Sequence, residues 1–406
     1  MKENKIKPAL LAVLSLTIGI LVATIAPCNV SYDATIFMFP WLKNMKLNGV
    51  FSMYKQVADA PFAVDYPPLY YSSMFLTVGS FVKVDNFDFS LIFIRLFPVI
   101  VNIFFVYFIA KHISPKWAMF YMLFPSVIIG TAIMGQSDMA FLFLIFLFFY
   151  FYYEKKDLYL FSVTYALMVC LKLQGIYFLP IFLFLLFTHE SPKERKRSAF
   201  LIGVLLGFII WLPWLIAEGL PIFFKVYLGS ASQELVWGFG GNFPFMFTAM
   251  LGLTDSPDSP FLVMLYNILN YGGLLLCVLI GFKTYKKTGD VLYSTAIYLF
   301  YIFMLTMHQY ERYEIYAWGV LFFIISTNFK YSNFEQRQRD ITKKIFWLVS
   351  IANICHFVAS IAIAASAANQ LFGILAYTIA FMCNLRTIVY TLQMPSTEEK
   401  APIDID

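Results

Sequence analysis

Apolar runs long enough to cross a lipid bilayer recur along this chain, and they restrict its fold more than any other feature. A membrane-spanning helix needs about 17–25 predominantly apolar residues. Runs of that kind, some of them shorter, lie at 8–26, 88–110, 117–134, 139–153, 158–171, 174–188, 198–217, 260–282, 290–307, 314–328, 345–366 and 369–392. Only 13% of the residues are charged, whereas soluble domains carry about 25%. We therefore predict an all-α, polytopic membrane protein, which excludes nucleic-acid binding, soluble enzymes and disordered scaffolds.

The distribution of Lys and Arg orients these runs. The segment 69–82 is short and contains Ser72, Ser73 and Ser80, and we expect it to lie along the membrane surface without crossing. With that choice, most of the 29 Lys and Arg residues fall in loops on one side, which the positive-inside rule places in the cytoplasm. The pattern predicts about 12 transmembrane helices (11–13), with both termini cytoplasmic.

No soluble domain fits between the runs, so we predict a single membrane-embedded domain over residues 1–406. The first run exceeds the apolar core of about 7–15 residues that a signal peptide has, and we expect it to be a retained span. The remaining organisation is a long first extracytoplasmic loop (28–87) carrying interfacial helices, a long outer loop (218–259) and a cytoplasmic tail (393–406). The five Cys residues form no CxxC, so they indicate neither a zinc site nor a disulfide framework.

Polar residues collect on the side that this topology places outside the cell. The cytoplasmic loops are short and basic and show no such mixture. The candidate site residues on the outer side are Asp33, Asp65, Tyr66, Gln136, Asp138, Lys172, Gln174, Asn242, His308, Glu311 and Arg312. We therefore expect the chemistry of this protein to take place on the extracytoplasmic face.

The three carboxylates in this set have structural alternatives. Asp33 follows the first span directly and could serve as the N-cap of the next helix, since Asp is a favoured cap. Asp65 precedes Tyr66-Pro67-Pro68, where the prolines restrict the backbone and suit the first turn of a helix. Asp138 stands where a helix N-terminus would stabilise an anion, as a cap or as a ligand. The sequence leaves both readings open for each.

Two further features involve cationic side chains. His308, Glu311 and Arg312 have spacings of three and four, so they would share one face of a helix. The residues on that face could form an ion pair at the surface. A phosphate-binding site suits a His, an acid and an Arg better. Arg95 is the one charge that this topology places inside an apolar run, where ionisable residues are costly and usually functional, although its long side chain could reach outward to water.

These residue types suit a group transfer at the membrane surface. A carboxylate can take the proton from an attacking hydroxyl. Cationic groups, or a metal ion held by Asp33, Asp65 and Asp138, can stabilise a leaving phosphate, and Mg²⁺ or Mn²⁺ would be the candidates. Nucleotide sugars are absent outside the cell, so a glycosyl donor there must arrive on a lipid carrier, with its phosphate at the interface.

The ordered set of motifs resembles the GT-C superfamily of polyprenyl-phosphate-sugar-dependent glycosyltransferases. It is most similar to bacterial mannosyltransferase-like proteins related to the second mannosyltransferase of GPI-anchor synthesis. The resemblance extends over about 280 residues, and two positions depart from it: Met134, where the family usually has Trp, and Gln309-Tyr310, which separate a His and a Glu that are usually adjacent. The motifs are Tyr32-Asp33, Asp65-Tyr66-Pro67-Pro68-Leu69, Gly135-Gln136-Ser137-Asp138, Lys172-Leu173-Gln174, Asn242 and His308 to Tyr313.

The resemblance implies a GT-C-like fold and a role for each matching residue. Asp33 would be the general base, and Asp65 and Asp138 would position the acceptor or the donor. Lys172, Gln174, His308 and Arg312 would contact the donor phosphate or sugar. The expected reaction is inverting transfer of a hexose, such as mannose, from a polyprenyl phosphate to a hydroxyl of a glycan, glycolipid or cell-wall polymer. The expected location is the plasma membrane, in the cell envelope of a bacterium.

Two other functions fit the same composition. A transporter or flippase for lipid-linked glycans would also have about twelve spans, but transporter sites lie near the bilayer midplane, whereas the polar set here lies on one face. A glycan polymerase or ligase would act on the same face and use a lipid-diphosphate oligosaccharide. The expected partners are thus a polyprenyl-phosphate donor, a glycan or lipid-linked acceptor and membrane lipids, with no nucleic acid.

Overall fold

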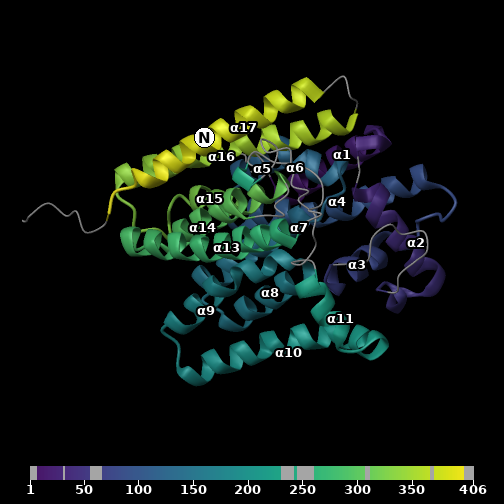
Figure 1. Cartoon of the computed structure of the whole chain (residues 1–406), viewed down its shortest axis with the longest axis horizontal. Coiled ribbons are helices and arrows are strands. Elements are labelled where there is room, and N and C mark those ends of the chain that lie inside the picture. The colour runs from purple at the N-terminus through teal and green to yellow at the C-terminus, as the bar shows by residue number, and fades with distance from the viewer. Residues whose placement is uncertain are drawn as a thin grey trace, which may run out of the picture. The chain divides into compact units, whose positions relative to one another are not determined.

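A computed structural model describes residues 7–30, 33–54, 66–229, 242–244, 260–306, 311–365 and 370–396 (Figure 1). Throughout these residues the chain is helical, and none of them forms a β-strand. The chain divides into two compact units, unit 1 (residues 1–233) and unit 2 (residues 234–406). The sequence, in contrast, predicts a single domain.

Unit 1 is built from α-helices separated by short 3₁₀ or π-helical turns. The α-helices are α1 (Pro8–Ile25), α2 (Phe39–Asn48), α3 (Pro68–Met74), α4 (Phe87–His112), α5 (Pro115–Met122), α6 (Pro125–Ile128), α7 (Asp138–Tyr153), α8 (Leu158–Leu171), α9 (Leu179–Thr188), α10 (Lys193–Glu218) and α11 (Pro221–Phe224). The short turns are η1 (Cys28–Val30), η2 (Ala34–Met38), η3 (Val50–Ser52), η4 (Phe75–Gly79), η5 (Ile129–Ile133), η6 (Leu173–Phe178) and η7 (Lys225–Gly229).

Unit 2 contains fewer and mostly longer helices. They are α13 (Pro260–Thr288), α14 (Val291–Leu305), η9 (Glu311–Glu314), α15 (Ile315–Ser326), α16 (Gln336–Ala365) and α17 (Gln370–Leu392). Helices α16 and α17 lie side by side (Figure 1) and bury Ala359, Ala376 and Tyr377 between them. Gly373 permits this approach, because a Cβ there would lie 2.7 Å from Cγ1 of Ile363.

Five of the described helices are long and apolar enough to cross a bilayer: α1, α4, α10, most of α16 and most of α17. A sixth results if α5 is joined to the segment 125–133, which is bent by 60° relative to it. Four shorter apolar helices cover 138–153, 158–171, 173–188 and 291–305. An all-helical protein with span-length helices is thus confirmed, and the number of twelve spans stays a prediction.

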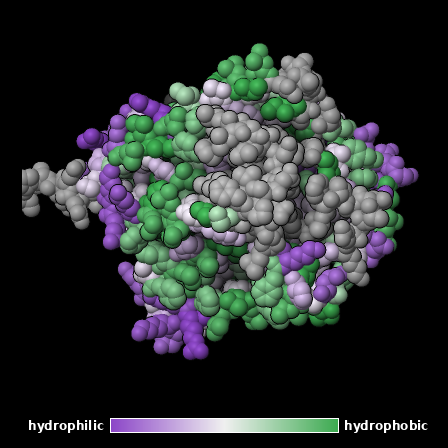
Figure 2. All heavy atoms as spheres, in the orientation of Figure 1, coloured by the Kyte–Doolittle hydropathy of each residue, from purple (hydrophilic) through white to green (hydrophobic). Residues whose placement is uncertain are grey.

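The surface of these helices suits a lipid environment. Figure 2 shows large hydrophobic areas on the exposed face, and α10 presents Leu201, Leu205, Phe208 and Ile209 with 52–56% of each residue exposed. An exposed apolar stripe of this kind is unfavourable in water and marks a surface that another apolar phase covers. Together with the span-length helices it supports a membrane location.

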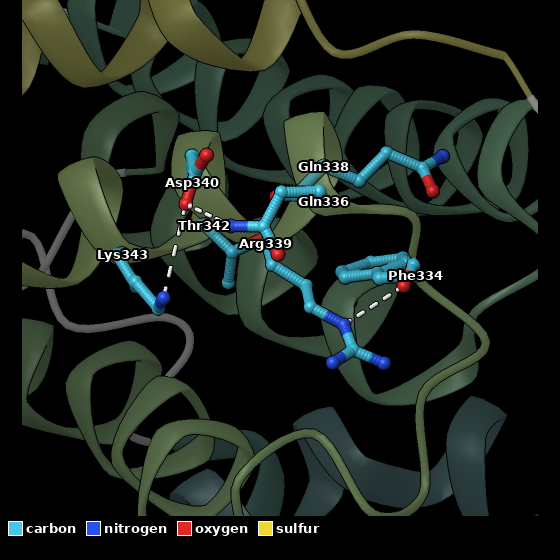
Figure 3. Close-up of polar contacts among 7 residues, drawn as sticks. All are labelled: Phe334, Gln336, Gln338, Arg339, Asp340, Thr342 and Lys343. Atoms are coloured by element: carbon cyan, nitrogen blue, oxygen red, sulfur yellow. Dashed lines mark hydrogen bonds and ion pairs between the residues drawn. The ribbon is translucent and has the colours of Figure 1, made fainter.

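Polar residues begin several helices, as the sequence leads one to expect. A capping side chain accepts a hydrogen bond from an otherwise unsatisfied backbone N–H of the first turn. The caps are Asn86 for α4, Ser114 for α5, Asp157 for α8 and Asp290 for α14. At the start of α16, Nε of Arg339 donates to the carbonyl of Phe334, and Lys343 pairs with Asp340 at 3.7 Å (Figure 3). This is one of the basic regions that the charge pattern places in the cytoplasm.

Candidate functional site

Asp33 follows α1 and the short turn η1, at the residue that precedes η2. Its carboxylate does not cap that turn. Instead, Oδ2 of Asp33 accepts a hydrogen bond of 2.7 Å from Nε2 of Gln136, which is 103 residues away in the chain. The capping alternative that the sequence leaves open is therefore wrong, and the carboxylate takes part in a tertiary contact between two predicted site residues.

The turn that carries Gln136 is formed by a glycine. Gly135 follows η5 with a φ of +71°, a left-handed conformation that glycine adopts without the steric penalty of a Cβ. The N–H of Gly135 donates to the carbonyl of Thr131, and the N–H of Gln136 donates to that of Gly130. This reversal turns Gln136 back toward the first segment, where its side chain is 2% exposed. The local sequence thus fixes the direction from which the amide approaches Asp33.

Asp138 and Lys172 form a buried ion pair. Nζ of Lys172 lies 2.6 Å from Oδ1 of Asp138, and both side chains are 0% exposed. Asp138 is the first residue of α7, so the partial positive charge of that helix N-terminus also favours its carboxylate. Removing either partner of such a pair leaves an uncompensated buried charge and is strongly destabilising. The pair therefore ties the start of α7 to the end of α8.

Lys172 occupies an extended residue between α8 and η6. The chain folds back there because Gly175 packs against the last turns of α8, where a Cβ would lie 2.7 Å from backbone atoms of Met168 and Val169. Gln174 stands in the same turn, and its Oε1 is buried with no hydrogen-bond partner. Such an acceptor is available to a hydroxyl or an N–H donor of a bound molecule.

An aromatic group adjoins the buried ion pair. The ring centroid of Tyr66 lies 6.0 Å from Nζ of Lys172, within the range of a cation–π contact. The same ring contacts Trp41, Tyr70 and Tyr71 at centroid distances of 5.4–6.3 Å. The candidate set contains only Tyr66 from this group. Tyr70 and Tyr71 come one turn after the Pro-Pro pair, and that helical spacing is the signal that could have added them.

Arg95 has contacts that explain its position without a bound molecule. Its side chain is nearly fully buried in α4, and the guanidinium donates to the carbonyls of Ala23, Ala26 and Pro27 at 2.6–3.2 Å. These carbonyls lie at the C-terminal end of α1, where backbone acceptors are unsatisfied and the helix dipole favours a cation. Arg95 thus holds the segment that leads to Asp33, and a direct substrate contact is not part of the function proposed below.

Four predicted residues belong to unit 2, and the structure describes three of them. Asn242 is 2% exposed, and Arg312 is 4% exposed with its guanidinium 5.4 Å from the ring centroid of Tyr313. Glu311 begins the turn η9, and it is described by its backbone alone. Asp65 and His308 lie outside the described residues. In unit 1 the structure brings predicted residues into contact: Asp33 with Gln136, Asp138 with Lys172, and Lys172 with Tyr66. The contribution of unit 2 to the site stays a prediction.

The metal prediction finds no preformed ligand set in the described part of the chain. No group of three or more His, Cys, Asp and Glu residues is arranged there to hold a metal ion. The contacts of Asp33 with Gln136 and of Asp138 with Lys172 use one oxygen of each carboxylate for an N–H donor. Carboxylates that bind Mg²⁺ or Mn²⁺ would present these oxygens to the ion, so we derive no step through a metal.

No family model matches the sequence of this chain, and none of the curated proteins matches it either.

Proposed function

We propose that this protein is an inverting glycosyltransferase of the GT-C type. It transfers a hexose, such as mannose, from a polyprenyl phosphate to a hydroxyl of a glycan, glycolipid or cell-wall polymer. In this proposal the chain has about twelve spans and both termini in the cytoplasm, and its site faces the outside of a bacterial plasma membrane.

The contact between Asp33 and Gln136 carries the proposal. A general base must be held in a fixed orientation within reach of the hydroxyl that it deprotonates. One oxygen of Asp33 accepts the 2.7 Å bond from Gln136, and this bond orients the carboxylate at the start of η2. The turns at Gly135 and Gly175 position the buried Asp138–Lys172 pair, and the Tyr66 ring lies 6.0 Å from Nζ of Lys172. Residues from the segments around Tyr66, Gly135 and Lys172 thus lie together with Asp33 in unit 1.

The reaction needs a single base. Asp33 takes the proton of the acceptor hydroxyl while the acceptor oxygen bonds to the anomeric carbon of the donor sugar. The bond from that carbon to the phosphate oxygen breaks, and polyprenyl phosphate leaves with the electron pair. Because the acceptor enters opposite to the leaving phosphate, the anomeric configuration inverts, and no second carboxylic acid is required.

The other residues then divide into two roles. Asp138 and Lys172 neutralise each other in a buried position, which suits them to holding the two turns of the site. Gln174 offers a buried acceptor to a sugar hydroxyl, and Tyr66, which is half-buried, offers an aromatic face to a sugar ring. We assign the donor phosphate to His308 and Arg312, the residues that the resemblance matches to that function.

The test is release of free polyprenyl phosphate by the purified protein in lipid. Polyprenyl-phosphate mannose and polyprenyl-phosphate glucose are offered as donors, with a cell-envelope glycan extract as the acceptor. We expect release that Asp33→Asn lowers by about 10²–10⁴-fold, the range that a general base contributes. Asp157→Asn is the matched control, since Asp157 caps α8 and Asn is an equally good cap. Equal release by Asp33→Asn and the wild type would remove Asp33 from the mechanism.

A further inference from the structure

A second buried acid–base pair lies in unit 2. Nδ1 of His356 lies 2.8 Å from Oε2 of Glu314, and both side chains are 0% exposed. Glu314 ends the turn η9, and His356 lies within α16, one of the span-length helices. Ionisable residues inside such helices are costly to bury and usually functional.

Polar side chains without partners adjoin this pair. The amide of Asn384, on α17, faces the carboxyl group of Glu314, although neither of its polar atoms makes a regular hydrogen bond. Asn353 lies one turn before His356 on α16, and both polar atoms of its amide are likewise buried and unpartnered. Oε1 of Glu314 is also without a partner. Both Asn residues are 0% exposed, so water does not reach them from the surface.

The groups that face the pair come from each packed helix. On α16, the thiol of Cys355 lies close enough to Glu314 for an electrostatic interaction with its carboxylate. On α17, the thiol of Cys383 does the same, and the ring of Tyr377 lies 6.0 Å from that of His356. Helix α14 contributes the apolar ring of Phe303 at 5.3 Å from His356. Arg312 belongs to the same turn as Glu314. Within the described part of the chain, His356 is the one ionic partner of Glu314.

The oxygen atoms around Glu314 exceed what His356 can satisfy. His356 reaches Oε2 and leaves Oε1 without a regular hydrogen bond. The amides of Asn384 and Asn353 each add a carbonyl oxygen and an NH2 group that also lack partners, so a cation bound by these oxygens would leave the NH2 groups free to turn away from it. A buried carboxylate requires a positive charge or a proton nearby. Carboxylate and amide oxygens are the ligands that hard cations prefer, and a proton on Oε1 would satisfy the same atom.

We propose that unit 2 binds a small monovalent cation, H⁺ or Na⁺, at Glu314, with the amides of Asn384 and Asn353 around it and His356 orienting the carboxylate. The site does not depend on the proposed glycosyl transfer, and its tests read out cation binding alone. The two cations share the same chemistry here, since each neutralises the carboxylate by contact with Oε1.

The first test uses the unaltered full chain in lipid nanodiscs. Dicyclohexylcarbodiimide reacts with protonated carboxyl groups in apolar surroundings, and mass spectrometry locates the product on Glu314. If the ligand is Na⁺, labelling should fall about tenfold at a Na⁺ concentration about ten times the Kd, relative to choline, because only the empty fraction reacts. If the ligand is H⁺, labelling should fall as the pH rises from about 5 to 8, with no effect of Na⁺. Asp290, a buried carboxylate held by the N–H of Tyr293, provides the internal control for Na⁺, and its labelling should be the same in Na⁺ and in choline.

The second test compares thermal unfolding of variants at constant ionic strength. Glu314→Gln carries no charge to neutralise, so its difference in Tm between Na⁺ and choline, or between low and high pH, should be smaller than that of the wild type. Asn384→Leu should raise the Na⁺ concentration needed for protection if Na⁺ is the ligand, while Glu314 still becomes protonated. Labelling of Glu314 that changes with neither Na⁺ nor pH would overturn the proposal. So would a Glu314→Gln variant whose Tm keeps the full cation and pH dependence of the wild type.

Discussion

Two buried acid–base pairs invite a direct comparison, one in each unit. The pair Asp138–Lys172 measures 2.6 Å and the pair Glu314–His356 measures 2.8 Å, and all four side chains are 0% exposed. The partners differ in chemistry. A Lys ammonium has three N–H donors and donates only as a cation, whereas an imidazole can donate an N–H from one ring nitrogen while it is uncharged. The first pair is therefore a fixed pair of opposite charges, and the second can exist as a neutral pair that shares one proton.

Their surroundings differ in the same sense. Asp138 stands at a helix N-terminus, where the backbone supports its negative charge. Glu314 also stands at a helix N-terminus, directly before α15, but its side chain does not cap that helix. It faces the amide of Asn384, whose polar atoms make no regular hydrogen bond. The comparison teaches that burial alone does not define the role of a carboxylate. A permanently charged partner makes the pair structural, and a titratable partner leaves room for a ligand.

The largest effect should come from removing the charge of Asp138. Asp138→Asn leaves the ammonium of Lys172 buried without its counter-charge, which costs about 3–5 kcal/mol for a buried pair. Chemical unfolding of the nanodisc-embedded protein measures this loss. The double variant Asp138→Asn, Lys172→Met should recover most of the stability, because no buried charge remains. A loss for Asp138→Asn well below that of other core substitutions would show that Lys172 escapes to water.

A smaller loss should follow a change in the turn that carries Lys172. Gly175→Ala places a methyl group 2.7 Å from the α8 backbone, and overpacking of this kind costs about 1–3 kcal/mol. Gly207→Ala is the matched control, because a Cβ there meets only Sγ of Cys170 at 3.9 Å. Both are measured by thermal unfolding. Equal Tm values for the two variants would contradict the packing of η6 on α8.

Glu314→Gln should destabilise the protein less than Asp138→Asn does. The amide is nearly isosteric with the carboxyl group, and His356 can remain neutral, so no uncompensated charge is left behind. We expect a change of about 1 kcal/mol, the size of one hydrogen bond, in the same chemical unfolding assay. If this variant lost as much stability as Asp138→Asn, the second pair would be a fixed ion pair like the first, and the comparison would fail.

The smallest effect should be the pH response of unit 1. Burial, and then the nearby Lys196 and Arg195, lower the pKa of His189, which follows α9, and Nδ1 of His189 accepts from the N–H of Ser191. Because the folded state disfavours the charged imidazole, this contribution to stability is present above the ordinary pKa of 6.5 and is lost as the pH falls below it. Tm should therefore decrease more steeply toward pH 5 in the wild type than in His189→Gln. Identical slopes would assign the acid response to other groups.

Much of unit 1 could be anticipated from the sequence, because its signals are local. Pro68 begins α3 where the Pro-Pro pair predicts a first helical turn, and Gly135 forms the turn that brings Gln136 toward Asp33. The short segment 69–82 lies mostly within α3 and η4, which have seven and five residues and follow each other directly from Pro68 to Gly79. This stretch is too short to cross a bilayer. The pattern could not show whether Asp33 caps a helix, since both outcomes place an Asp at the same residue.

The sequence by itself determined that this chain is helical and that it carries apolar helices of membrane-spanning length. These properties depend on composition and on spacing within one or two helical turns. Only the tertiary structure decided which polar residues meet: Asp33 with Gln136, Asp138 with Lys172, and Glu314 with His356. The partners in these pairs are 103, 34 and 42 residues apart, and helix packing, which local sequence does not encode, brings them into contact.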